Sequence, residues 1–186
     1  MFTLEQPSMA LNDTRLDVIV QMAITKTIQP SEGISQILGY VVTEAKKQPE
    51  GRLKNLVFNC HGTPGELQMG AGIIRSLTDR FKMLAPDDKP LVDVIYLRSC
   101  TVARIDGGGT DSDGNLFCST IAKNAKCTVV ASTAVQTTNF KYSVNGPLPF
   151  GMLDKFEGTT LVYGPEGNVL RSATNPMYST WSLDRD

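Results

Sequence analysis

His61 and Cys100 are the two residues whose types and spacing could do chemistry together. His61 is the only histidine of the chain and follows an apolar run at 56–58, whereas Cys100 comes shortly after a second apolar run at 91–97. If both runs are parallel strands, both side chains lie at the carboxyl edge of a sheet, where open α/β folds carry out their chemistry. A histidine beside a cysteine can activate the thiol as a nucleophile. The pair together therefore predicts catalysis, although either residue alone at a strand end is more often structural.

Strand-like and helix-like segments alternate along the chain and must position this pair. The expected strands are 16–24, 54–59, 92–97 and 128–133, with a small hairpin arm at 66–69 and a terminal hairpin made by 159–163 and 168–171. The expected helices are 32–47, with Ser31 as N-cap, then 71–84 and 115–125. The alternation predicts one α/β domain over 1–186, with an irregular lead-in at 1–15 and a tail at 172–186. Its sheet should be mostly parallel with helices on both faces, and the terminal hairpin should add an antiparallel edge.

The composition argues against two classes of partner, nucleic acid and a membrane that the chain would span. The 186 residues are 41% hydrophobic and 20% charged, and 18 basic residues balance 19 acidic ones without a basic cluster. This balance argues against nucleic acid as a partner. No apolar stretch approaches the roughly 20 residues that span a bilayer, and the first residues lack the basic region of a secretory signal. We therefore expect no membrane span, and a location in the cytoplasm or outside the cell by a route that needs no signal peptide.

The other three cysteines fit neither a disulfide scaffold nor a metal site, because the chain has no CxxC pair. We expect reduced thiols, no metal and no cofactor. Side chains alternate along a strand, so Cys60 should point away from the face that carries His61 and pack against a helix. Cys118 and Cys127 lie in or beside a helical pattern and are expected in the core.

The order of the motifs resembles a known superfamily. The run LVFNCHG at 56–62, then a helix, then the strand and turn VIYLRSC at 94–100, resembles the caspase, hemoglobinase and gingipain superfamily of cysteine peptidases, clan CD. The continuation HGTPGEL at 61–67 and the later run VVAS at 129–132 are similar to its bacterial members. The resemblance covers about residues 54–135. The caspase signature Gln-Ala-Cys-x-Gly is absent, so no preference for the substrate residue before the scissile bond is implied.

The resemblance implies a caspase-like α/β/α sandwich and cysteine endopeptidase activity on a protein or peptide, as in a bacterial effector, a toxin or a self-processing protease. Cys100 would be the nucleophile and His61 its proton-transfer partner. Gly62 would leave room for the substrate backbone, and the N–H groups of Gly62 and Cys100 would form the oxyanion hole.

Five further residues are candidates for substrate contact. The loop after Cys100 could border the cleft and receive a basic side chain on one of its aspartates, whereas an arginine before Cys100 could select an acidic one. The candidates are Asp106, Asp111, Asp113, Arg98 and, at the end of the next predicted strand, Ser132.

The aspartate loop has a plainer interpretation. Its sequence DSDGN at 111–115 resembles half of a calcium loop, but Ala122 stands where such a loop needs a glutamate. The favoured alternative is a solvated loop whose Asp or Asn caps the following helix.

Two alternative functions stay open. A caspase-like domain that has lost activity would bind partners, although the intact histidine and cysteine pair argues against that loss. A cysteine amidase or acyltransferase acting on a non-protein substrate would use the same pair, and only its substrate would distinguish it.

Overall fold

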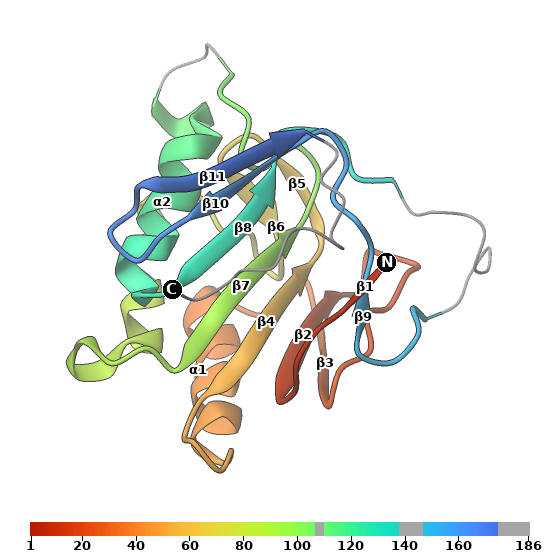
Figure 1. Cartoon of the computed structure of the whole chain (residues 1–186), viewed down its shortest axis with the longest axis vertical. Helices are drawn as coiled ribbons and strands as arrows, with labels where there is room; N and C mark the ends of the chain where they lie inside the picture. The colour runs from red at the N-terminus through yellow and green to blue at the C-terminus, as the bar shows by residue number, and fades with distance from the viewer. Residues whose placement is uncertain (107–109, 138–146, 175–186) are drawn as a thin grey trace.

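A seven-stranded sheet forms the centre of the molecule (Figure 1), in a computed structural model that describes residues 1–106, 110–137 and 147–174. Its order is β11-β10-β8-β7-β4-β2-β3. The strands are β2 (Ser8–Asp13), β3 (Ile24–Ile28), β4 (Leu53–Asn59), β7 (Val92–Arg98), β8 (Thr128–Ser132), β10 (Thr159–Tyr163) and β11 (Val169–Thr174). Strands β3, β2, β4, β7 and β8 are parallel, whereas β10 is antiparallel to both β8 and β11. The predicted α/β class, with a mostly parallel sheet flanked by helices and a C-terminal hairpin, is confirmed.

Two small sheets and the helices complete the fold. The small sheets pair β1 (Phe2–Thr3) with β9 (Met152–Leu153) and β5 (His61–Thr63) with β6 (Glu66–Gln68). The helices are α1 (Ile34–Lys46) and α2 (Gly114–Ala125), with 3-10 segments η1 (Arg75–Leu84), η2 (Pro86–Asp88) and η3 (Thr110–Ser112). The expected tail starts later than predicted, because β11 runs to Thr174, and residues 175–186 lie outside the described ones.

The strand expected at 16–24 is wrong, and so is the irregular lead-in expected at 1–15, since β2 lies within it. The apolar segment instead runs as an extended connection against the sheet. Two asparagine side chains supply the hydrogen bonds that a neighbouring strand would otherwise give to its main chain. Asn12 bonds to both the N–H and the C=O of Val20, and Asn59 donates to the C=O of Val18. A buried main chain needs partners, and these side chains supply them without a strand.

Two helix starts also differ from the prediction. Gly33, not Ser31, is the N-cap of α1, and no side chain caps that helix. The helix expected at 71–84 begins only at Arg75 and is a 3-10 helix, because Ile73 is still extended and exchanges two main-chain hydrogen bonds with Leu67. By contrast, Asp113 caps α2 as predicted, accepting a 2.9 Å hydrogen bond from the N–H of Leu116.

The helices lie on one face of the sheet rather than on both. The connections β3 to β4, β4 to β7 and β7 to β8, which carry α1, η1 and α2, all step across the sheet in one direction. Parallel crossovers are right-handed, so a common direction places all three on the same face. Only the connection from β2 to β3 steps the other way. It has no helix, and Val18, Val20 and Met22 pack from it on the second face.

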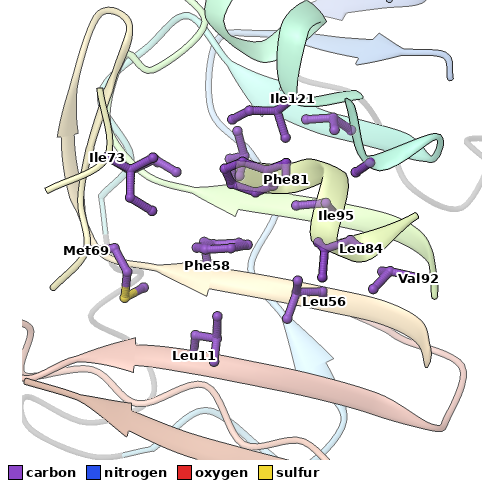
Figure 2. Close-up of a cluster of buried hydrophobic side chains, with 14 of the residues drawn as sticks. Leu11, Leu56, Phe58, Met69, Ile73, Phe81, Leu84, Val92, Ile95 and Ile121 are labelled. Atoms are coloured by element: carbon purple, nitrogen blue, oxygen red, sulfur yellow. The ribbon is translucent and has the colours of Figure 1, made fainter. Parts of the chain in front are cut away.

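The main core fills the space between the sheet and these helical segments. Figure 2 shows Phe58 and Ile95 of the sheet with Phe81 of η1 and Ile121 of α2, all fully buried. The rings of Phe58 and Phe81 lie 5.9 Å apart in a tilted contact. The second face has its own cluster, in which Val57, Tyr96 and Val130 lie under the segments at 1–4 and 148–156. With both faces covered, the carboxyl edge of the sheet is where strand-end side chains can meet solvent.

Candidate functional site

The pairing of β4 with β7 brings His61 and Cys100 to the same place. These neighbouring parallel strands are in register at Asn59 and Arg98, and the N–H of Cys60 donates to the Arg98 carbonyl at 3.3 Å. His61 and Cys100 each lie two residues past the last paired residue of their strand. Because neighbouring parallel strands lie about 4.8 Å apart, both residues leave the sheet at the same edge.

Gly62 provides a direct contact between the two strand ends. A Cβ atom at this position would lie 2.0 Å from Ser99 Oγ, 2.9 Å from the Glu66 carbonyl oxygen and 3.3 Å from the Cys100 carbonyl oxygen. Only a glycine lets the main chain approach this closely. The residue next to His61 therefore packs directly on the main chain of Cys100.

Strand alternation separates Cys60 from His61, as predicted. Cys60 belongs to the core on the helix face and is buried, whereas His61 is exposed at the start of β5. Burial raises the pKa of the Cys60 thiol well above its usual range, although the Ser99 hydroxyl beside it opposes the shift. A buried, neutral thiol is a poor nucleophile, so Cys60 is a weaker candidate for reaction than the half-buried Cys100.

Cys100 sits in a tight turn at the end of β7 and is half-buried. The residue after it, Thr101, has φ +52°, which is rare for a β-branched residue. Its N–H donates to the Ala134 carbonyl at 2.8 Å, which holds this turn against the segment that follows β8. Strained main chain of this kind is often found at functional sites.

The N–H of Gly62 stays outside the hydrogen-bond ladder of its hairpin. Gly62 faces Leu67 of β6, but the N–H and C=O of Leu67 both bond to Ile73. Among the described residues, neither Gly62 nor Cys100 donates its main-chain N–H to another main-chain group. Within residues 1–106, 110–137 and 147–174, two donors on adjacent strand ends thus have no main-chain acceptor.

Arg98 and Ser132 are held inside the protein. The Arg98 guanidinium is about nine-tenths buried, donates to Asn59 Oδ1 at 2.7 Å and pairs with Asp154 Oδ2 at 3.0 Å. Ser132 is fully buried, and its hydroxyl donates to the Glu157 carbonyl at 2.5 Å. The charge of Arg98 is compensated and the hydroxyl of Ser132 is occupied, so the structure gives both side chains an internal role.

The three aspartates of the loop after Cys100 divide between two roles. The carboxylate of Asp113 is engaged as the α2 cap, which favours the plainer interpretation at that position. Asp106 is exposed and pairs with Arg104 at 3.2 Å, and Asp111 is exposed as well. The Asp111 carbonyl approaches Gly65 of the β5–β6 turn, so this loop lies against the hairpin that carries His61. Residues 107–109 of the loop lie outside the described ones.

An ion pair between the buried Asp13 and the exposed Arg15 holds that hairpin in place. Asp13, at the end of β2, accepts hydrogen bonds from the Arg15 guanidinium at 2.7 Å and from the Gly70 N–H at 2.8 Å. Arg15 also donates to the carbonyls of Gln68 and Gly70. Burial acts to raise the pKa of Asp13, but these hydrogen bonds outweigh it and hold the pKa below its usual value. The hairpin is therefore tied to β2 as well as to β7.

Gln136 is the residue of the site that the sequence did not single out. Its N–H donates to Cys100 Sγ at 3.4 Å, and its carbonyl accepts from the same sulfur at 3.6 Å. Its side chain bonds to both main-chain groups of Glu157. The contacts with the thiol are made by main-chain atoms, which every residue type has, so the sequence could not indicate them. The only available signal was the position of Gln136 just past the end of β8.

No described group of three or more histidine, cysteine, aspartate or glutamate side chains is arranged to hold a metal ion. None of the described helices is long and apolar enough to cross a membrane. Comparison of the chain with protein-family models, with curated proteins and with solved structures gave no match.

Proposed function

We propose that this protein is a cysteine endopeptidase in which Cys100 is the nucleophile and His61 transfers the proton. The observation that carries the proposal is the packing of Gly62 on the main chain of Cys100, next to the exposed His61. Two supporting features are the tight turn that presents Cys100 and the main-chain N–H groups of Gly62 and Cys100, which have no main-chain acceptor in the described part of the chain. The mostly parallel α/β sheet agrees with the caspase-like resemblance of residues 54–135, although its helices cover one face and not both.

The chemistry follows from these positions. A His61 ring nitrogen takes the thiol proton, and Cys100 Sγ attacks the carbonyl carbon of the peptide bond. The N–H groups of Gly62 and Cys100 bind the negative oxygen that forms, which is the largest contribution such a site usually makes. His61 then gives its proton to the leaving amine as the C–N bond breaks. Water, deprotonated by His61, hydrolyses the resulting thioester and restores the free thiol.

Reactivity of the thiols gives a first test, which needs no substrate. Cys100 is the one half-buried cysteine of the chain, whereas Cys60, Cys118 and Cys127 are buried and have pKa values raised by burial. A brief treatment of the folded protein with iodoacetamide should label Cys100 first. Peptide mapping by mass spectrometry identifies the labelled site, and preferential labelling of Cys60 would show that the nucleophile is misassigned.

Activity against a diverse peptide library tests the function itself. Cys100→Ala should abolish cleavage, and His61→Ala should lower it by at least about 100-fold, within the range that a general base contributes. Because the two residues act as one unit, the double variant should be no worse than Cys100→Ala. Cys60→Ala is the matched control, since it removes a neighbouring thiol from the core and should affect mainly stability.

The conditions should be reducing, with and without calcium, and self-cleavage should be scored. If the wild-type protein cleaves nothing, the chain is better described as an inactive binding domain, or as an amidase or acyltransferase for another substrate. If cleavage persists in Cys100→Ala, the nucleophile lies elsewhere.

A further inference from the structure

In the described part of the chain, the Cys100 thiol is bonded to main-chain groups and not to a base. Gln136 offers it both a donor and an acceptor, with N···S at 3.4 Å and S···O at 3.6 Å. No hydrogen bond or ion pair joins the His61 ring to any residue within 1–106, 110–137 or 147–174. The thiol thus donates to the Gln136 carbonyl and not to its proposed acceptor.

Side-chain bonds clamp the segment that carries Gln136. Gln136 Nε2 donates to the carbonyls of Ala134 at 3.1 Å and Glu157 at 3.2 Å, and the Glu157 N–H donates to Gln136 Oε1 at 3.0 Å. Ser132 Oγ adds a bond to the same Glu157 carbonyl and accepts from the Ala134 N–H at 3.1 Å. The Thr137 hydroxyl bonds to the Glu157 carboxylate. The main chain of Gln136 is therefore held rigidly where it meets the sulfur.

We propose that Gln136 is a positioning residue that latches the Cys100 thiol in a resting orientation, which the segment at 134–137 must release before His61 can take the proton. The inference rests on the proposed function, because it takes Cys100 as the nucleophile.

The physical reason lies in the two main-chain groups. The neutral thiol satisfies both of them, donating to the carbonyl and accepting from the N–H. A thiolate would keep the N–H bond but would face the carbonyl oxygen, which repels it. The neutral, latched form is therefore favoured until the segment moves. The half-burial of Cys100 has the same origin, since the Gln136 main chain covers one side of the sulfur.

Gln136→Met tests the latch, because it preserves the size of the side chain and removes its three hydrogen bonds. Iodoacetamide attack, in which an S–C bond forms and iodide leaves, is followed by mass spectrometry at fixed pH. Cys100 should react about five- to tenfold faster than in the wild type. This is the change expected when the free energy needed to open the segment at 134–137 falls by roughly the net contribution of one hydrogen bond. Val135→Ala is the matched control, since Val135 is exposed in the same segment and should leave the rate unchanged.

A second variant and a coupling measurement separate positioning from damage. Ser132→Ala loosens the same clamp from its other side and should also accelerate Cys100. Cys60, Cys118 and Cys127 should stay slow in both variants, which shows that the fold is intact. His61→Ala should slow alkylation more in the Gln136→Met background than in the wild type, because only the released thiol reaches the histidine.

An unchanged or lower rate at Cys100 in both clamp variants overturns the latch, whatever the peptidase assay shows. Faster alkylation of Cys100 in these variants would support the latch. If His61→Ala then cleaved peptides as well as the wild type, the proposed function would be overturned while the latch proposal stood. The two proposals therefore fail by different measurements.

Discussion

At Gly62 the ends of two strands approach so closely that one methyl group has no space. The nearest atom to an added Cβ is Ser99 Oγ, followed by the main-chain oxygens of Glu66 and Cys100. The hydroxyl can rotate, but the main-chain oxygens can move only with their strands. The geometry of the candidate site therefore depends on the absence of a side chain at this position.

Gly62→Ala should destabilise the protein by about 1–3 kcal/mol, the usual range for overpacking. It should also lower the alkylation rate of Cys100, because the added methyl group separates His61 and Gly62 from the turn at Cys100. Urea denaturation measures the first effect and thiol labelling the second. Adding Ser99→Ala removes the closest contact and should recover part of the stability but not all of it, since Glu66 and Cys100 remain.

Gly39→Ala is the matched control for this substitution. Gly39 lies within α1, and an added Cβ would meet nothing within 4 Å. Replacing a helical glycine with alanine usually stabilises by about 0.5–1 kcal/mol. If Gly62→Ala is as harmless as Gly39→Ala, the close approach of the two strand ends is not required.

The sequence could place His61, Gly62 and Cys100 past the ends of two strands, because strand ends are visible as the ends of apolar runs. It could not predict that Gln136 contacts the Cys100 thiol, or that Glu157 holds Gln136. Their contacts run through main-chain atoms and through a segment that returns to the site only after β8. It also could not tell that Arg98 is buried, since an arginine beside a strand end has the same pattern whether it faces a substrate or an internal carboxylate.

At the level of elements, Arg98 links the end of β7 to the segment that covers the second face. Its guanidinium reaches Asn59 at the end of β4 and Asp154 just after β9. Arg98 and Asp154 have only 10% and 12% of their side chains exposed. This ion pair joins three parts of the chain beside Cys100, so it should stabilise the fold near the site.

Asp154→Ala should lower the free energy of unfolding by about 3 kcal/mol or more, because it leaves the Arg98 charge buried without its partner. The double variant Arg98→Met, Asp154→Leu should recover most of that loss, since an apolar pair of similar volume carries no uncompensated charge. Urea denaturation of the single and double variants gives both values. A loss in Asp154→Ala below about 0.5 kcal/mol would match an exposed ion pair and contradict the internal role.

The strand predicted at 16–24 is absent for a reason that concerns neighbouring elements. The run LDVIVQMAI has the composition of a strand, and its apolar residues are indeed buried, as the contacts of Val20 and Met22 show. What composition cannot show is which groups satisfy the main chain. Here the side chains of Asn12 and Asn59, from neighbouring strands, take the place of a ladder.

For the whole molecule, the direction of the crossovers explains why one face carries the helices. The sequence predicted the order of elements but not which strands become neighbours. Because β4, β7 and β8 follow one another on the same side of β3, all helical connections proceed in one direction. The resulting core on the helix face contains three of the four cysteines, Cys60, Cys118 and Cys127.

The thiols buried in this core make the protein less stable at alkaline pH. Burial raises the pKa of Cys60, Cys118 and Cys127 well above their usual range. In the unfolded chain the same thiols ionise near pH 8.5, so above that pH the folded state holds more protons than the unfolded state. The free energy of unfolding therefore falls as pH rises, and below pH 8.5 the full stability is present.

The slope of that fall is the measurable quantity. Each buried thiol contributes up to about 1.4 kcal/mol per pH unit, so the three together give about 4 kcal/mol per unit above pH 8.5. Urea denaturation under reducing conditions between pH 7 and 10 should show it. Cys118→Ala should reduce the slope by about a third, whereas Val130→Ala, an equally buried truncation without an ionisable group, should lower stability equally at every pH. A slope that is the same in wild type and Cys118→Ala would mean that this thiol ionises within the folded protein, and it would contradict the raised pKa.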